Sequence, residues 1–154
     1  MTRSVEILNE VPGFRIDANT VEKLIQTLDE FEAFTIPPGH LDIVYVTAER
    51  CGELHRDHFD DPSITDVMTF PGDPDDDHAG DIAICPQYAA EACLDHGTSF
   101  PEEVTLYLLH AWLHLAGFDD QSDTARSEMR DAEERLMTYV LNTCGLPACS
   151  LNNG

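Results

Sequence analysis

The chain has 154 residues, of which 42% are hydrophobic and 25% are charged, a composition typical of one soluble globular domain. Thirty acidic residues against eight basic ones give it a formal net charge of −22. Because nucleic-acid-binding proteins normally carry a basic stripe, we expect no DNA partner, and the charge weighs against an RNA partner as well.

Membrane and secretory classes are also disfavoured. The longest apolar run, about residues 104–118, is too short to span a membrane, and the N-terminus lacks the basic and apolar segments of a secretion signal. The cysteines are odd in number and form no C-x-x-C pair, which predicts reduced thiols rather than disulfides or a thiolate zinc site. We therefore expect a cytoplasmic protein with no membrane partner.

The first half of the chain alternates strand and helix patterns. Alternating polar and apolar residues predict a strand over 3–9, and the helical spacing of apolar residues predicts a helix over 17–34. A β-branched and aromatic run predicts a buried strand over 41–46, and residues 47–58 form the next expected helix. The residues expected to cap these two helices are Asp17 and Thr47.

In the second half, we expect short strands around 66–70 and over 80–85, an acidic loop over 73–80 between them, and a helix over 86–95. The spaced aspartates of the loop resemble a calcium-binding loop. However, its twelfth position is Ile84, where such a loop needs a bidentate glutamate. A solvated loop is the better interpretation.

Two further helices complete the expected fold. An S-x-x-E capping box at Ser99 begins a helix that is apolar nearly all round and should lie at the centre of the protein. An amphipathic helix over 122–141 follows, and residues from Gly145 onward should fray. The pattern predicts an α+β fold, a single domain with a small mixed sheet of about four strands packed with helices. The arginines expected in surface ion pairs on the last helix are Arg126, Arg130 and Arg135.

The central helix carries two histidines four residues apart, His110 and His114. Four residues are about one helical turn, so both imidazoles project from one face and can share a metal ion. Gly117 favours a left-handed turn at the helix end, which would bring Asp119 and Asp120 back towards the histidines. With one carboxylate added, three protein ligands would leave a position for water, as in catalytic zinc sites.

A structural interpretation of these residues stays open. The histidines could be core residues bonded to backbone carbonyls, and the aspartates could cap the following helix. In the H-E-x-x-H motif of zinc proteases, the glutamate after the first histidine is the general base, whereas this chain has Ala111 there. A peptidase of that type is therefore disfavoured, and a hydrolase of another peptide or of a small molecule is a further alternative.

Four blocks of sequence are specific enough to suggest a family. They are L-L-H-A-W-L-H-L-A-G-F-D-D at 108–120, T-D-V-M-T-F-P at 65–71, G-D-I-A-I-C at 80–85, and the spacing of Met129 and Glu133. The first block resembles the motif H-G-x-L-H-L-x-G-Y-D-H of the YbeY family, and the other blocks follow in that family's order. The resemblance covers residues 40–137. Members of this family are bacterial rRNA maturation factors described as metal-dependent single-strand endoribonucleases.

The resemblance implies that His110, His114 and Asp120 hold one Zn²⁺ ion, with another divalent metal as an alternative. Asp119 matches the family aspartate that precedes the third ligand and is a natural partner for orienting an imidazole. Most members have a histidine as the third ligand. Aspartate can bind zinc at nearly the same distance, but its negative charge could favour harder ions such as manganese or magnesium.

Many members also carry an arginine a few residues before T-D-V, and its place here falls at or near Phe59. Arg56, one helical turn earlier, is our candidate for the same catalytic role, with a plain surface arginine as the alternative. Together with Arg50, His55 and His58 it forms the cationic cluster of the chain, which could hold one or two phosphates.

The resemblance further implies that residues 1–154 form a single metal-dependent hydrolase domain that cleaves single-stranded RNA. Its setting would be rRNA maturation and ribosome quality control, with the ribosomal small subunit or ribosomal proteins as partners. Asp66 and Asp81 match family positions that flank the cleft, although burial and turn capping explain them equally well. The acidic surface favours an alternative, a non-catalytic ribosome-assembly or protein-binding factor with a structural metal site.

Overall fold

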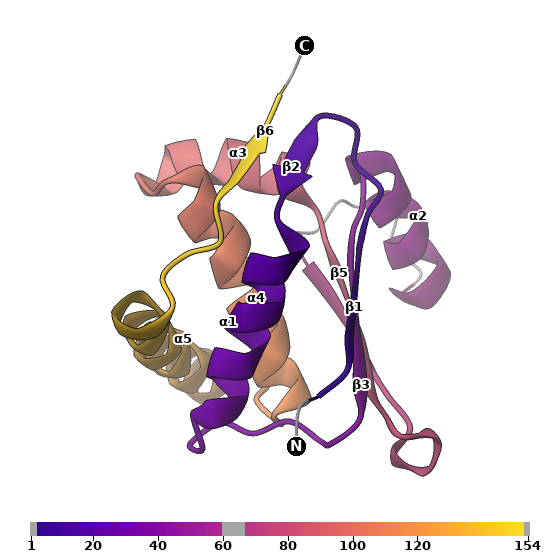
Figure 1. Ribbon diagram of the computed structural model, residues 1–154, viewed down its shortest axis with the longest axis vertical. Helices are drawn as coiled ribbons and strands as arrows, with labels where there is room; N and C mark the ends of the chain where they lie inside the picture. The colour runs from indigo at the N-terminus through magenta and orange to yellow at the C-terminus, as the bar shows by residue number, and fades with distance from the viewer. Residues whose placement is uncertain (1–2, 60–66, 153–154) are drawn as a thin grey trace.

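The computed structural model describes residues 3–59 and 67–152 of the chain. Within these residues, a four-stranded sheet in the order β1-β3-β5-β4 lies at the centre of the fold (Figure 1). Strands β1, β3 and β5 are parallel, and β4 runs antiparallel to β5 at the edge. The sheet is therefore mixed, and the predicted α+β fold is confirmed. The strand bounds are β1 Val5–Asn9, β3 His40–Tyr45, β4 Val67–Pro71 and β5 His78–Ile84.

Helices cover both faces of this sheet. Figure 1 shows α1 and α4 on one face and α2 on the other. Helices α3 and α5 both pack against α4. The short 3-10 helix η1, Pro74–Asp76, lies between β4 and β5. The helix bounds are α1 Ala18–Glu30, α2 Ala48–Phe59, α3 Pro86–His96, α4 Phe100–Leu115 and α5 Asp123–Thr143.

Helix α4 lies in the core, as its apolar composition predicts. The Ser99 hydroxyl accepts the Glu102 N–H at 3.2 Å and so caps the first turn. Trp112 is fully buried, and its Nε1 donates to the Phe34 carbonyl at 3.1 Å. Burial of each large side chain contributes roughly 1.5–3 kcal/mol, so the core fixes this helix firmly against the sheet.

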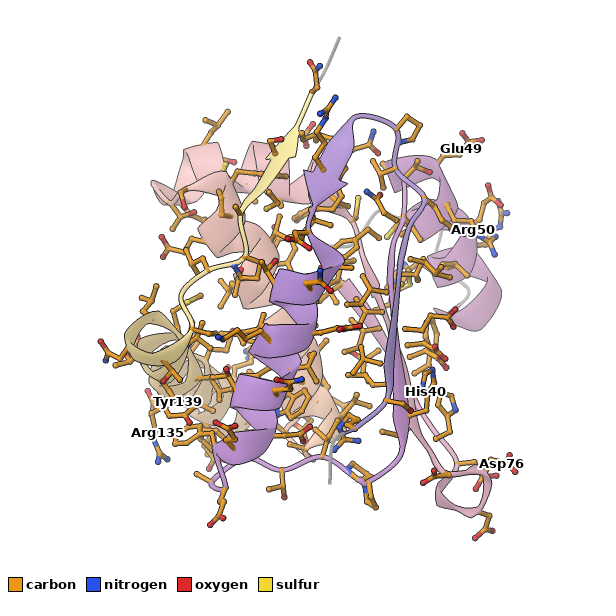
Figure 2. The ribbon with its side chains drawn as sticks, in the orientation of Figure 1. His40, Glu49, Arg50, Asp76, Arg135 and Tyr139 are labelled. Atoms are coloured by element: carbon orange, nitrogen blue, oxygen red, sulfur yellow. The ribbon has the colours of Figure 1, made fainter. Side chains whose placement is uncertain are left out.

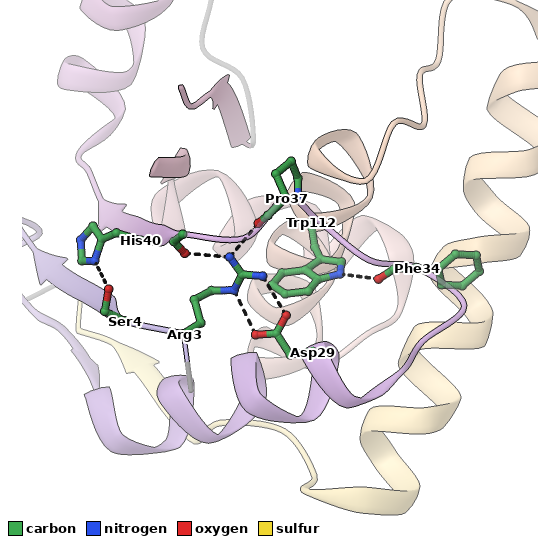
Figure 3. A network of polar contacts seen from close by, with 8 residues as sticks. Arg3, Ser4, Asp29, Phe34, Pro37, His40 and Trp112 are labelled. Carbon is green, nitrogen blue, oxygen red and sulfur yellow. Dashed lines mark hydrogen bonds and ion pairs between the residues drawn. The ribbon is translucent and has the colours of Figure 1, made fainter. Parts of the chain in front are cut away.

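Arg3 anchors the segment between α1 and β3. Its guanidinium makes two 3.0 Å bonds to the Asp29 carboxylate and donates to the carbonyls of Pro37 and Gly39 at 2.8 and 2.7 Å (Figure 3). The same group lies 5.8 Å from the ring centroid of Trp112. A bidentate arginine pair is geometrically specific, so the network holds this segment in one place.

Two local predictions are wrong. The residues after Gly145 do not simply fray, because β6 Cys149–Leu151 pairs antiparallel with β2 Phe14–Ile16 and packs on the core. The acidic loop is also shorter than expected, since β5 begins at His78, which pairs with His40 of β3. Both errors concern pairing with distant segments, which a local pattern does not reveal.

Some helix details differ as well. Helix α1 ends at Glu30 rather than at residue 34, and Phe31 instead stacks on Tyr139 with ring centroids 4.7 Å apart. Arg126 pairs with Asp123 as predicted, whereas the guanidinium of Arg135 lies over the ring of Phe34 at 5.0 Å. The predicted strand start at Asp66 lies outside the described residues. None of the helices in the described residues has the length and apolar character that a membrane span requires.

Candidate metal centre

His110 and His114 lie in the last two turns of α4 and project from one face. Their ring centroids are 4.6 Å apart at an interplanar angle of 81°, and their Nε2 atoms are 3.0 Å apart. The two side chains are 24% and 28% exposed. The four-residue spacing therefore places both imidazoles together, within reach of solvent.

A backbone turn after α4 brings the chain back to these histidines. Gly117 has a φ of +106°, its N–H bonds the His114 carbonyl at 3.1 Å, and the Phe118 N–H bonds the Leu113 carbonyl at 2.9 Å. These two bonds form a Schellman motif, in which glycine is preferred because other residues are strained at positive φ. The turn explains how residues beyond the helix reach the histidine face.

Asp120 supplies a third potential donor. Its Oδ2 lies 3.9 Å from Nε2 of His110 and 3.8 Å from Nε2 of His114. Bonds of about 2.0–2.2 Å to a tetrahedral zinc ion place neighbouring ligand atoms roughly 3.3–3.6 Å apart. The observed separations are close to this range, so the donor set fits one divalent ion.

The outer nitrogens of both imidazoles face oxygen acceptors. Nδ1 of His114 lies 3.1 Å from the Phe118 carbonyl, and Nδ1 of His110 lies 3.5 Å from a carboxylate oxygen of Glu133. A carbonyl oxygen can only accept, so Nδ1 of His114 carries the ring proton, and the carboxylate favours the same tautomer at His110. Both Nε2 lone pairs then point to one place, an arrangement typical of metal-binding histidines.

The electrostatic setting keeps His114 in its metal-binding form. Burial lowers the pKa of its imidazole, and the neighbouring His110 lowers that pKa further, while Asp120 and the Phe118 carbonyl act in the opposite direction. The imidazole is therefore neutral at neutral pH. Neutral imidazole is the form that binds metals.

The three donors open onto a cavity of about 550 Å³. Its walls are the end of α4, the edge strand β4 and the start of β5, with Pro37 and His55 contributed by other segments. A Cβ atom at Gly80 would lie 2.8 Å from Cδ2 of Leu115, so glycine there allows the end of α4 to sit directly on β5. The cavity volume lies within the range of small-molecule and cofactor sites.

Besides Asp120, the structure places the Glu133 carboxylate close to an imidazole, and the Asp119 carboxylate acts to raise the pKa of His114. The Asp119 carboxylate accepts the Gln121 N–H at 3.2 Å. Glu133 is 15% exposed and reaches His110 from α5. Its M-x-x-x-E spacing with Met129 was visible in the sequence, but that spacing does not show which residue of α4 it faces.

The predicted cationic cluster lies on α2. Arg50 bonds the Glu53 carboxylate at 3.3 Å, and Arg56 is exposed. Among the described residues, His55 lines the cavity and Arg56 does not. The side chains of His58 and Phe59 lie outside the described part of the structure.

Comparisons with known proteins identify the family of this chain. The family model described as Endoribonuclease YbeY matches residues 7–140. The Endoribonuclease YbeY of Protochlamydia amoebophila is 37% identical over 124 residues, which cover 78% of this chain and 76% of that protein. The Endoribonuclease YbeY of Beutenbergia cavernae is 33% identical over 148 residues, which cover 90% of this chain and 97% of that protein. A solution structure of a Thermotoga maritima protein matches with a TM-score of 0.63 at 27% identity and covers 90% of this chain and 89% of that one. The chain therefore belongs to the Endoribonuclease YbeY family.

Proposed function

We propose that residues 1–154 form a single metal-dependent hydrolase domain that acts as a zinc-dependent endoribonuclease on single-stranded RNA. The observation that carries this proposal is the convergence of His110, His114 and Asp120 at an open cavity, in a chain of the Endoribonuclease YbeY family. The setting that we propose is rRNA maturation and ribosome quality control in the cytoplasm.

Nε2 of His110, Nε2 of His114 and a carboxylate oxygen of Asp120 would hold one Zn²⁺ ion. When bound, such an ion polarises a phosphoryl oxygen and lowers the pKa of a water molecule at its open position. Asp120 adds a negative charge that a third imidazole would not, so the donor set also suits a harder ion such as Mn²⁺.

Groups around the donors hold them in place before substrate arrives. The Phe118 carbonyl and the Glu133 carboxylate face the Nδ1 atoms of the two imidazoles. Arg126 Nη1 donates to the backbone carbonyl of Asp120 at 3.2 Å and so ties the loop to α5. Preorganised groups of this kind need little rearrangement during reaction, which favours a catalytic role.

Phosphate recognition by so acidic a protein must be local. His55 lines the cavity from α2, and we assign Arg56, the next residue of this helix, the role of neutralising charge that develops on the phosphorane. Because Arg56 is exposed and does not line the cavity, its guanidinium would have to turn towards the bound RNA. A divalent ion adds positive charge nearby. With a net charge of −22, the affinity for RNA should be modest and should fall as salt rises.

The direct test is cleavage of a single-stranded RNA by purified protein before chelation, after chelation and after Zn²⁺ is restored. We expect RNA cleavage before chelation, no cleavage after chelation, and renewed cleavage once Zn²⁺ is restored. His114→Ala should lower the rate on the order of 100-fold or more, because it removes a ligand. The control His96→Ala removes an exposed histidine near the end of α3 and should leave the rate close to wild type. Cleavage that survives chelation, or full activity in His114→Ala, would overturn the metal mechanism.

Arg56 can be tested separately on the same substrate. Arg56→Ala should lower kcat on the order of tenfold, because charge on the phosphorane loses a partner. Arg50→Ala removes an arginine that already bonds Glu53 on the same helix and should have a smaller effect. Equal rates for the two variants would remove Arg56 from the mechanism and leave the metal ligands unaffected.

A second candidate function follows from the charge of the protein. An acidic surface is complementary to basic ribosomal proteins, as expected of a small-subunit assembly factor with a structural ion. The exposure of the donors and the cavity beside them favour the enzyme, because structural zinc sites are usually closed by four protein ligands. Retention of ribosomal proteins from a lysate, with no RNA cleavage by the metal-loaded protein, would favour the assembly factor.

A further inference from the structure

A second group of carboxylate and imidazole side chains lies on the other face of the sheet. Glu6, Asp42 and Asp81 are directly paired across β1, β3 and β5, and His40 is paired with His78. Side chains of directly paired residues point to the same face of a sheet and stand about 5 Å apart. The topology therefore gathers carboxylates and imidazoles from three strands at one place.

This face is opposite to the one that α4 covers. Leu41, Ile43 and Ile82 alternate with the polar residues along β3 and β5, and they are buried in the core that includes α4. Because successive strand residues point to opposite faces, the polar group is turned away from that core. Figure 2 shows His40 on the side of the sheet away from α1 and α4.

The contacts within the group leave three donor atoms facing one another. Nε2 of His40 lies 2.8 Å from Oδ1 of Asp42. Nδ1 of the same ring lies 2.8 Å from the Ser4 hydroxyl, as Figure 3 shows. The other oxygen of Asp42 lies 3.8 Å from Nε2 of His78, and that nitrogen lies 3.4 Å from Oδ1 of Asp81. His40 thus holds one oxygen of Asp42 and leaves the other directed at His78.

The charges of this group favour a cation. Like charges directly opposite on neighbouring strands are destabilising. Asp42 and Asp81 are such a pair. A divalent cation between the two carboxylates would offset this repulsion.

We propose that Asp42, His78 and Asp81 form a second site for a divalent metal ion such as Zn²⁺ or Mn²⁺. Their three donor atoms lie within 4.8 Å of one another. The separations of 3.4 and 3.8 Å are close to the roughly 3.3–3.6 Å expected between ligands of a tetrahedral ion. The three side chains are between 29% and 43% exposed, so an ion enters directly from solvent.

Binding requires one local change. Nε2 of His78 now lies 3.1 Å from the Gly80 carbonyl. To bind an ion, this nitrogen exchanges the carbonyl for the metal, and the ring proton resides on Nδ1. The ion would join β3 to the start of β5, where His78 and Ala79 also line the cavity. An ion at the second site would therefore stiffen one wall of the cavity beside the first site, and the two sites share no ligands.

The test is isothermal titration of the full chain with Co²⁺, chosen as a zinc substitute. We expect two ions per chain for wild type and one for His114→Ala. The double variant His114→Ala, Asp42→Asn should bind the remaining ion at least about tenfold more weakly. The matched control is His114→Ala, Asp76→Asn, which removes the same charge from an exposed aspartate of η1 and should still bind one ion.

The outcomes for the two sites are distinguishable. Loss of all binding in His114→Ala overturns the second site alone. If wild type and His114→Ala each bind one ion and Asp42→Asn binds none, the second site is supported and the first is overturned. If circular dichroism shows that Asp42→Asn is unfolded, Asp81→Asn combined with His114→Ala makes the same test. If the Asp42→Asn or the Asp81→Asn double variant is folded and binds the remaining ion as tightly as His114→Ala does, the proposal is overturned.

Discussion

Replacing Glu133 with glutamine tests whether α5 tunes the metal centre through His110. The carboxylate lies 3.5 Å from Nδ1 of His110. A full positive charge on the imidazole would be attracted to the carboxylate at that distance by about 5 kcal/mol, for an effective dielectric constant near 20. A metal-bound imidazole carries only part of the ion's charge, and a glutamine oxygen still accepts the ring proton. We therefore expect Zn²⁺ affinity to fall by about 10–100-fold, or about 1.4–2.8 kcal/mol.

The affinity is measured by competition with a coloured zinc chelator. Glu134→Gln is the matched control, because Glu134 is exposed on the same helix and its replacement removes the same charge. The control should bind Zn²⁺ nearly as tightly as wild type. Equal affinities for Glu133→Gln and wild type would refute the role of the contact. An equal loss in both variants would show that net charge, and not the contact with His110, sets the affinity.

Three further predictions concern the supports of the site. Gly117→Ala should lower the free energy of unfolding by about 1 kcal/mol or more, because alanine is strained at a φ of +106°, and thermal unfolding measures this loss. Trp112→Phe leaves the Phe34 carbonyl without its donor and should cost at least about 1–3 kcal/mol in urea denaturation, whereas an unchanged midpoint would contradict the role of this bond. The pKa of His114 is lowered from 6.5, so protons should compete with Zn²⁺ at this residue only below that pH; zinc titrations of the wild-type chain at decreasing pH measure this, and a fall in affinity that begins above that pH would contradict the lowered pKa.

Features that depend on a few consecutive residues were predictable from the sequence. The N-cap at Ser99, the spacing of the two histidines and the turn at Gly117 each follow from local chemistry, and the structure contains all three. Together they account for the convergence of Asp120 on the histidine face. The central helix could be recognised because its apolar residues lie nearly all round it.

Features that depend on the meeting of distant segments were not predictable. Strand β6 pairs with β2 from the opposite end of the chain, and each strand is too short for a periodic signal. The contact of Glu133 with His110 depends on how α5 crosses α4. The proximity of Asp42 to His78 depends on strand order and register, which no single segment encodes.

A crystal structure of the zinc-loaded protein, with anomalous scattering recorded at the zinc edge, would show whether the three side chains share one ion. We predict a peak about 2.0–2.2 Å from Nε2 of His110, Nε2 of His114 and an oxygen of Asp120. Rings that turn apart, with no anomalous peak between them, would contradict it.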